Sequence, residues 1–177
     1  MCSLYLNSSI HLRLDFSGNI YGHSKLPQPM PRSFSMQIAD LASSGQFCAM
    51  ADRIPALPGA YLLLVKLRTV TFVKLPNRPS VPLVPGDYIY AGSANGPGGL
   101  KARVSRHMRR GKRRRWHIDE LTETGDVLGA WIFPGGSECD LVETNSALPV
   151  PIVGFGSTDC KHCRSHLLGP TSAVQNS

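Results

Sequence analysis

The sequence predicts an α/β domain in which helices flank a small, largely antiparallel sheet. Two observations support this prediction: three short apolar or β-branched segments follow one another between residues 61 and 92, and helical patterns with a further strand come after them. The predicted order is β-β-β-α-α-β-α, which suits an α/β sandwich around one core. The length of 177 residues fits one such domain with terminal extensions.

The first half of the predicted domain consists of strands. Residues 61–67 are almost wholly apolar, as in a strand inside a sheet, and residues 69–75 are rich in β-branched side chains. The short gap between these two segments favours a hairpin. A proline-rich loop over residues 76–85 follows, and residues 86–92 are predicted to form a third strand.

A glycine-rich turn at residues 96–99 precedes a predicted helix over residues 100–110. Apolar residues recur every four positions along this helix, and the stripe that they form should be buried: Leu100, Val104 and Met108. Gly111 follows directly, and glycine commonly ends a helix.

The remaining predicted elements are two helices and one strand. A short helix is expected over residues 116–122, and a strand over residues 127–133. A last helix is expected over residues 138–148, where Ser137 occupies the usual place of an N-cap. Asp119 lies in the short helix, where it either helps to begin that helix or supports a functional site.

The predicted domain spans residues 56–169. Residues 1–55 show no sustained period of 2 or 3.6, and three prolines between residues 27 and 31 interrupt regular structure there. We therefore expect a poorly ordered N-terminal extension with at most a short helix over residues 36–43. Residues 170–177 are expected to form a flexible tail.

The chain carries a net charge of +7 and has a pI of about 9.4, which suits a polyanionic partner such as nucleic acid. No run reaches the roughly 18 apolar residues of a spanning helix, and the N-terminus lacks the pattern of a secretory signal. We therefore expect a cytoplasmic protein without a membrane partner. Its five cysteines are odd in number and irregular in spacing, which is more typical of free thiols or metal ligands than of disulfides.

Nine of the 19 basic residues lie between residues 101 and 115, and no acidic residue interrupts them. Such a block attracts phosphate groups and makes binding dependent on salt, although a solvated helix face with a basic loop has the same composition. Arg103, His107 and Arg110 are spaced to share one face of the helix. The residues expected to contact nucleic acid are Lys101, Arg106, Arg110, Lys112, Arg113, Arg114 and Arg115.

Three motifs follow one another along the domain: Gly59-Ala60-Tyr61, Tyr90-Ala91-Gly92, and a helix that carries Arg103 and His107. Their order resembles that of the GIY-YIG nuclease family, over residues 59–169. Alanine replaces the isoleucine of both motifs, at positions expected to face the sheet or the core. Further segments, among them Trp116-His117-Ile118-Asp119 and Glu138-Cys139, resemble the Uri-type endonucleases, a subgroup catalogued as domain of unknown function 123.

The resemblance implies an endonuclease that hydrolyses phosphodiester bonds with Mg²⁺ or Mn²⁺, on DNA rather than RNA. Arg103 would stabilise the charge that develops on the phosphate, and Tyr61 would take the proton of the attacking water. Tyr90 and His107 would position Tyr61 and this water. Without the order of the motifs, both tyrosines would instead be interpreted as core residues of their strands.

The last predicted helix offers two glutamates that could hold the catalytic metal. Glu138 is favoured because it lies in the Glu-Cys pair of the Uri-type subgroup. Glu143 is the alternative, since the segment around it is similar to the corresponding motif of the excision-repair nucleases. A single carboxylate with water molecules is a usual way to hold Mg²⁺.

A second group of candidate metal ligands lies near the C-terminal end of the domain: Cys160, Cys163 and His166. A Cys-x-x-Cys pair with a histidine three residues on has the spacing of zinc ligands, and Cys139 could complete a set of four from a distance. The alternative is a reduced pair of thiols in a tight turn.

Three functions remain open on the sequence alone. The first is a metal-dependent endonuclease that acts on DNA, and the second is a nucleic-acid-binding module that keeps the fold without catalysis. The third is a small zinc-stabilised interaction domain whose positive charge is incidental. The first is favoured because the motifs keep Arg103 and the candidate glutamates.

Overall fold

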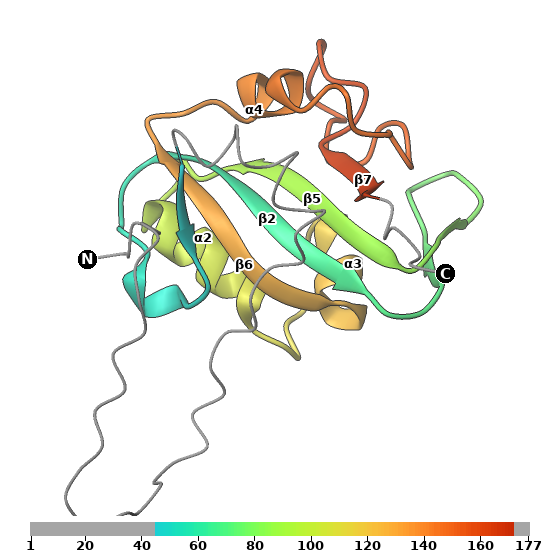
Figure 1. The fold of residues 1–177 in the computed structure, drawn as a ribbon, viewed down its shortest axis with the longest axis horizontal. Helices are drawn as coiled ribbons and strands as arrows, with labels where there is room; N and C mark the ends of the chain where they lie inside the picture. Colours follow the sequence, from blue (N-terminus) through green and yellow to red (C-terminus); the bar gives the residue numbers. More distant parts are fainter. Residues whose placement is uncertain (1–44, 172–177) are drawn as a thin grey trace, which may run out of the picture.

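The structure, a computed structural model, describes residues 45–171, which form a five-stranded antiparallel sheet, a two-stranded sheet and three α-helices (Figure 1). The predicted α/β class is therefore confirmed. The strands are β1 (Gln46–Cys48), β2 (Gly59–Leu67), β3 (Thr71–Val73), β4 (Val81–Leu83), β5 (Gly86–Ser93), β6 (Asp126–Pro134) and β7 (Leu167–Thr171). The helices are α2 (Gly99–Met108), α3 (Ile118–Thr124) and α4 (Glu138–Thr144), with a 3₁₀ turn η1 (Ala51–Arg53). Among these described helices, none has the length and apolar character needed to cross a membrane.

The large sheet has the strand order β1-β6-β2-β5-β7, and each neighbouring pair is antiparallel. The central strand β2 pairs with β5 on one side and with β6 on the other. In this register Tyr61 lies opposite Gly92, and Leu63 lies opposite Tyr90. The side chains of Tyr61 and Tyr90 are therefore diagonal neighbours on one face of the sheet.

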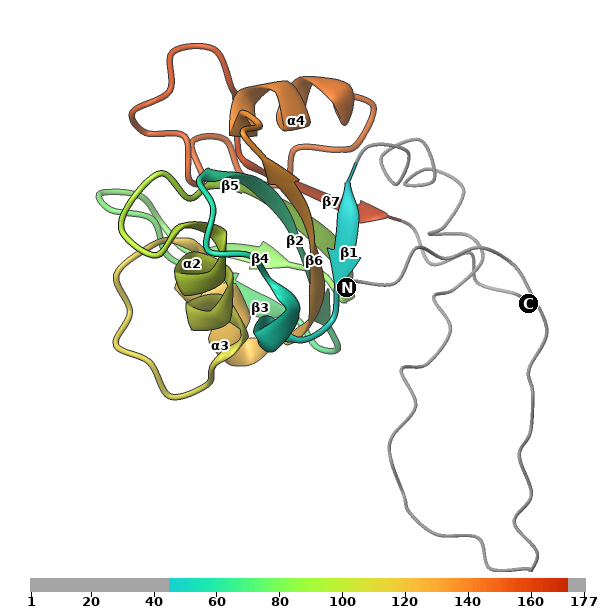
Figure 2. The same ribbon diagram turned by 90° about the vertical axis from the view of Figure 1, so that its left-hand side faces the viewer.

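Alternation along β2 divides the core into two layers. Tyr61 and its alternate neighbours belong to a cluster that includes Leu100 and Val104, the buried stripe of α2. Ala60 and its alternate neighbours belong to a second cluster, which includes Leu141 of α4. The sheet accordingly lies between α2 and α3 on one side and α4 on the other (Figure 2).

The predicted hairpin between residues 61–67 and 69–75 is wrong. β3 pairs instead with β4, which forms inside the predicted proline-rich loop, and the two make a separate sheet. Both edges of β2 are occupied by β5 and β6, which are 8 and 9 residues long, whereas β3 has 3 residues. The longer ladders bury more apolar side-chain surface, so these distant pairings outweigh the local one.

Regular structure begins before residue 56, the predicted start of the domain. β1 pairs with β6 as an edge strand of the large sheet, and the side chains of Cys48 and Ile54 are buried in the core. β1 could not be predicted from the sequence because a strand of three residues shows almost no periodicity. The expected helix over residues 36–43 lies outside the described residues, as do the other residues before 45.

The C-terminal end of the domain also differs from the prediction. β7 forms the second edge of the large sheet and extends to Thr171, where the sequence predicts a tail from residue 170 onward. Gly169 and Pro170 argue against a strand in the sequence, because glycine weakens a strand and proline is tolerated in a sheet mainly on an edge. α4 ends at Thr144, earlier than predicted, and Ser137 occupies its N-cap without a side-chain capping hydrogen bond.

Candidate active site and metal cluster

A buried hydrogen bond joins β2 to α2 at the centre of the candidate active site. The hydroxyl of Tyr61 lies 2.9 Å from Nε2 of His107, and both side chains are almost completely buried. Tyr90, on the neighbouring strand, is buried on the same face of the sheet and packs edge-on against Phe155. The predicted pair of motif tyrosines and the predicted helix histidine therefore lie together.

Two glycines leave room for the two tyrosines. A Cβ atom on Gly92 would collide with the hydroxyl of Tyr61, because that hydroxyl lies directly over the Gly92 backbone. Gly156 has φ +72°, and a Cβ atom there would lie 2.7 Å from the ring of Tyr90. The glycine of the Tyr90-Ala91-Gly92 motif thus has a steric role toward the tyrosine of the first motif.

Burial and three charged residues change the pKa of both tyrosine hydroxyls. Burial raises the pKa of Tyr61 well above its usual value and raises the pKa of Tyr90 to about 12. The guanidinium of Arg103 opposes this increase at both residues, while the carboxylates of Glu138 and Asp119 add to it. Arg103 and Glu138 therefore lie within electrostatic reach of both hydroxyls.

The two candidate metal-binding glutamates occupy different positions on α4. Glu138 begins the helix and is half-buried, whereas Glu143 is exposed. Five residues of α-helix turn the side-chain direction by about 140°, so the two carboxylates point to different sides. Within residues 45–171, no ion pair or hydrogen bond is formed by the carboxylate of Glu138. Of the two, Glu138 is the carboxylate whose charge raises the pKa of both tyrosines.

His107 is a neutral side chain at ordinary pH. Burial lowers its pKa to about 3, against the opposing field of the Asp119 carboxylate. Its second ring nitrogen, Nδ1, lies 3.8 Å from Oδ1 of Asp119, and no described group makes a hydrogen bond with it. One nitrogen of the ring therefore faces Tyr61 and the other faces a carboxylate.

Asp119 lies near Nδ1 of His107, whereas Tyr61 lies near Nε2. Its carboxylate accepts two hydrogen bonds from Arg106, at 2.7 and 2.8 Å, and two from the backbone N–H groups of Arg115 and Trp116. Burial works to raise the pKa of Asp119, but these bonds outweigh it and lower the pKa to about 2. The guanidiniums of Arg103 and Arg106 lie 4.1 and 4.2 Å from the ring centre of Trp116, which holds Arg103 beside the site.

Several of the predicted nucleic-acid contacts are already paired inside the chain. The acids of α3 and of the start of β6 supply the partners that the local sequence lacks: Arg106 with Asp119, Arg110 with Asp126, Lys112 with Glu123, and Arg114 with Glu120. The expectation that Arg110 shares a helix face with Arg103 and His107 is wrong, because α2 ends before Arg110. Arg110 instead bonds to the backbone carbonyls of Glu123 and Gly125.

The remaining basic residues are free to meet a ligand. Among the nine basic residues between 101 and 115, the side chains of five form no ion pair or hydrogen bond with the described residues: Lys101, Arg103, Arg109, Arg113 and Arg115. Three of them line a shallow hollow of about 370 Å³, and every residue that lines it is basic except one glycine: Arg106, Arg109, Arg110, Gly111, Lys112, Arg113 and Arg115. This hollow, hereafter the basic hollow, has the charge needed for a phosphate group.

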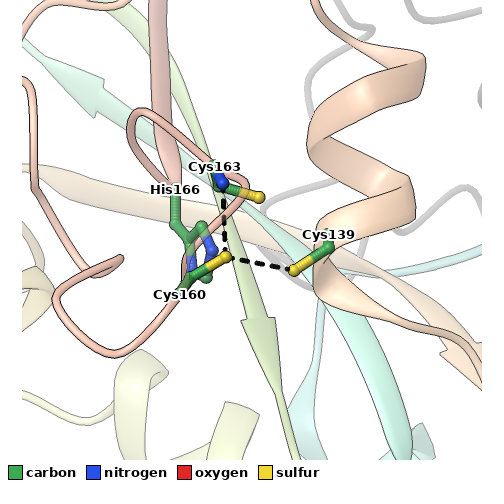
Figure 3. Close-up of side chains that lie close together, drawn as sticks. All are labelled: Cys139, Cys160, Cys163 and His166. Atoms are coloured by element: carbon green, nitrogen blue, oxygen red, sulfur yellow. Dashed lines mark hydrogen bonds between the residues drawn. The ribbon is translucent and has the colours of Figure 1, made fainter.

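A cluster of four metal-ligand side chains lies beside the first turn of α4 (Figure 3). Cys139 comes from the first turn of α4, and the segment before β7 supplies Cys160, Cys163 and His166. Their ligand atoms all lie within 4.8 Å of one another, with the Sγ atoms of Cys139 and Cys160 3.5 Å apart. The predicted proximity of these residues is confirmed, and the cluster can hold a metal ion.

The chemistry of this cluster, hereafter the cysteine cluster, suits a metal. Nε2 of His166 is buried and makes no hydrogen bond with any described group. The backbone N–H of Cys163 donates to Sγ of Cys160 at 3.2 Å, and this bond, together with that from the backbone of His162, lowers the pKa of Cys160 to about 6. A lowered pKa favours the thiolate, which is the form that binds metals.

The cysteine cluster is connected to the tyrosines through short paths. Cys139 follows Glu138 directly in the first turn of α4. The backbone of His166 accepts a hydrogen bond from Ala91 N–H at 2.9 Å and donates one to Phe155 at 2.8 Å. Phe155 in turn packs on Tyr90. Sequence reasoning treats the two regions as separate sites, but the fold makes them neighbours.

The fold and these two sites define a class of small α/β domain: an antiparallel sheet with a buried Tyr-His pair beside a basic surface and a Cys₃His cluster beside α4. The family described as "Domain of unknown function DUF123" matches residues 60–176, and the chain belongs to this family. No curated protein and no solved structure matches the chain significantly.

Proposed function

We propose that this protein is a metal-dependent endonuclease of the GIY-YIG type, in the Uri group, that hydrolyses phosphodiester bonds in nucleic acid and prefers DNA to RNA. One observation carries the proposal: Tyr61 and His107 form a buried hydrogen bond where the fields of Arg103 and Glu138 meet. A core-packing role for the tyrosines gives no reason for an arginine, a histidine and an unpaired carboxylate to gather around them.

Mg²⁺ fits the residues at this site. Glu138 is a half-buried carboxylate without a cationic partner among the described residues, and it raises the pKa of both tyrosines. A hard cation favours oxygen ligands, and a single carboxylate leaves positions for water and for a phosphate oxygen. A bound Mg²⁺ would supply positive charge to the phosphoryl group.

Each neighbouring side chain has a defined part in this proposal. Arg103, held against Trp116, stabilises the negative charge on the non-bridging oxygens of the phosphate. Tyr61 receives the proton of the attacking water, and His107 hydrogen bonds with the Tyr61 hydroxyl. Tyr90 closes the other side of the site and limits the room for the water.

The basic hollow supports nucleic acid as the substrate. It lies at the end of α2, the helix that also carries Arg103 and His107, so a strand bound along it passes close to the tyrosines. The unpaired cations at its rim, Arg109, Arg113 and Arg115, suit a phosphate backbone rather than a specific base.

Zinc is the metal proposed for the cysteine cluster. Three thiolates and one imidazole form a usual donor set for structural zinc, and tetrahedral bonds near 2.3 Å place sulfur atoms about 3.8 Å apart. The separation of 3.5 Å between the Sγ atoms of Cys139 and Cys160 is close to this value. The metal would fasten the start of α4 to the segment before β7.

Two other functions are compatible with parts of the structure. A nucleic-acid-binding module without catalysis is supported by the basic hollow alone, and a zinc-stabilised interaction domain is supported by the cysteine cluster alone. Neither explains why the Tyr61–His107 pair lies beside Arg103. We therefore favour the nuclease over both of these functions.

The test is a cleavage assay with the purified full-length chain. Branched, nicked, single-stranded and duplex DNA, and the corresponding RNA, are incubated with Mg²⁺ or Mn²⁺ and with a chelator. We expect metal-dependent cleavage of DNA that Arg103→Ala reduces by roughly 10²-fold or more, since it removes charge stabilisation in the transition state. Binding without cleavage by the wild-type chain would favour the non-catalytic module.

A further inference from the structure

We infer that Asp119 is a positioning residue, which holds His107 as the tautomer with hydrogen on Nδ1 and so presents a bare Nε2 to the hydroxyl of Tyr61. The hydrogen-bond arrangement stands on the structure alone, and its catalytic meaning rests on the proposed function. The sequence does not distinguish this role of Asp119 from that of a helix-starting residue.

The geometry places an oxygen atom near each nitrogen of the His107 ring. Nε2 lies 2.9 Å from the hydroxyl of Tyr61, and Nδ1 lies 3.8 Å from Oδ1 of Asp119. The second distance exceeds an ordinary hydrogen bond, but catalytic contacts are often long in a site without substrate. Nδ1 is buried and makes no hydrogen bond with any described group, so Asp119 is the neighbour that could accept a hydrogen bond from it.

A neutral imidazole carries one hydrogen, and the two tautomers differ in what they place against Asp119. With hydrogen on Nδ1, the ring points an N–H dipole at the carboxylate, and the hydroxyl of Tyr61 donates to Nε2. With hydrogen on Nε2, the lone pair of Nδ1 would face a carboxylate in a buried region of low dielectric. The first tautomer is therefore favoured.

Asp119 is suited to this task because its charge and direction are fixed. Its side chain is fully buried, and four hydrogen bonds from Arg106, Arg115 and Trp116 keep it ionised. Three of these bonds reach Oδ2, whereas Oδ1 accepts only one. The oxygen nearest to His107 thus retains a lone pair for the Nδ1 hydrogen.

In this arrangement Nε2 of His107 can accept the proton of Tyr61. As the water attacks phosphorus, its proton moves to the oxygen of Tyr61, the O–H bond of Tyr61 breaks, and a new N–H bond forms at Nε2 of His107. The imidazolium that results lies against the Asp119 carboxylate, which stabilises it. Since burial disfavours charge on both His107 and Tyr61 beforehand, the two proton movements accompany the attack instead of preceding it.

The first experiment reads the tautomer of His107 directly. Nitrogen NMR of the histidine side chains is recorded on the full-length wild-type chain near pH 7, and the His107 signals are assigned by their loss in His107→Gln. We expect a neutral ring with hydrogen on Nδ1. A ring with hydrogen on Nε2, or a charged ring, would overturn the inference whether or not the protein cleaves nucleic acid.

The second experiment compares Asp119→Asn with Glu120→Gln. Both replace an acid by its amide on adjacent positions of α3, and Glu120 pairs with Arg114 at 2.5 Å on the surface. In Asp119→Asn the amide can donate to Nδ1, which moves the ring hydrogen to Nε2. We expect the rate of cleavage to fall by roughly 10²-fold or more, in line with the loss of a proton acceptor, with nucleic-acid affinity little changed.

Each outcome of this comparison has one meaning. A folded Asp119→Asn protein that keeps its cleavage rate, or keeps hydrogen on Nδ1, would overturn the positioning role. If Asp119→Asn fails to fold, the tautomer of the wild-type chain decides the inference on its own. If the wild-type chain cleaves no substrate while His107 carries hydrogen on Nδ1, the proposed function fails and the hydrogen-bond arrangement stands.

Discussion

The hydroxyl of Tyr61 lies 2.9 Å from Nε2 of His107, although 46 positions separate the two residues in the sequence. This contact joins the centre of the sheet to the helix that covers it, and both partners are almost fully buried. Removing one partner of a buried hydrogen bond lowers the stability of the fold, because the other partner is left unsatisfied. Variants of this contact can therefore be used to measure its contribution to cleavage and its contribution to stability separately.

Tyr61→Phe separates these two effects. The variant keeps the ring but leaves Nε2 of His107 without a partner, which should lower the free energy of unfolding by roughly 1–3 kcal/mol. Cleavage should fall below detection because no group remains to take the proton of the water. Denaturant unfolding and the cleavage assay measure the two changes.

Tyr88→Phe is the matched control. Tyr88 is also buried on β5, and its hydroxyl donates to the carbonyl of Val84 at 2.8 Å, away from the site. It should lose stability while cleaving normally. Equal losses of cleavage in both variants would mean that Tyr61 acts only through the fold.

Gly92→Ala tests the steric reason for the glycine of the second motif. The new methyl group would collide with the Tyr61 hydroxyl, so the ring has to shift away from His107. Overpacking of this kind should lower the free energy of unfolding by about 1–3 kcal/mol, and cleavage should fall with it. Gly96→Ala, four residues further on in the bend after β5 and with no atom within 4 Å of a new Cβ, should leave both unchanged. A fully active Gly92→Ala protein would contradict the placement of Tyr61.

The order of the motifs was sufficient to predict the central residues of the candidate site. Tyr61, Tyr90 and His107 lie on elements long enough to show their periodicity, so these elements follow from the pattern. That the three residues approach one another was expected only from the resemblance to the GIY-YIG family. The edge strands β1 and β7 escape prediction because they have 3 and 5 residues, and β7 contains a proline. Short edge strands are stabilised by the neighbouring strand rather than by their own pattern.

The charge pattern predicted the nucleic-acid-binding residues less well than the motifs predicted the candidate active site. The sequence shows an uninterrupted basic block, but α3 brings Asp119, Glu120 and Glu123 against it in space. A local sequence carries no information about which distant acid will meet which base. For the same reason, the several contacts of Asp119 appear only once Arg106 and the backbone around Trp116 are placed beside it.

The unpaired cations of the basic hollow should determine binding to nucleic acid. Arg109→Gln and Arg113→Gln each remove a cation that has no acidic partner within residues 45–171. Each should weaken DNA binding to all sequences alike and reduce the salt slope of log K by about 1, as the loss of one phosphate contact does. Fluorescence anisotropy across a salt series measures both quantities.

Lys74→Gln removes the same charge from an exposed position after β3, outside the basic hollow. Its binding and salt slope should match those of the wild-type chain. If Lys74→Gln and Arg113→Gln weaken binding equally, the attraction comes from net charge, and the basic hollow is not the binding surface.

His166→Gln tests zinc at the cysteine cluster. The purified wild-type chain should contain about one zinc ion, since three cysteines and one histidine form a complete tetrahedral set. His166→Gln removes a ligand whose Nε2 is buried and without a hydrogen-bond partner among the described residues. Metal binding contributes to folding free energy, so the variant should contain less zinc and unfold at a lower temperature.

His162→Gln is the control, because His162 belongs to the same loop but its side chain is exposed and lies outside the cluster of four ligands. It should keep both its zinc and its melting temperature. The cleavage assay then separates the two metals, because His166→Gln should lose activity through the displaced start of α4 and Glu138, and added Mg²⁺ should not restore it. A wild-type chain that contains no zinc, with Cys139 and Cys160 joined in a disulfide, would show that the cluster is a redox pair and that α4 is fastened by a covalent bond instead of a metal.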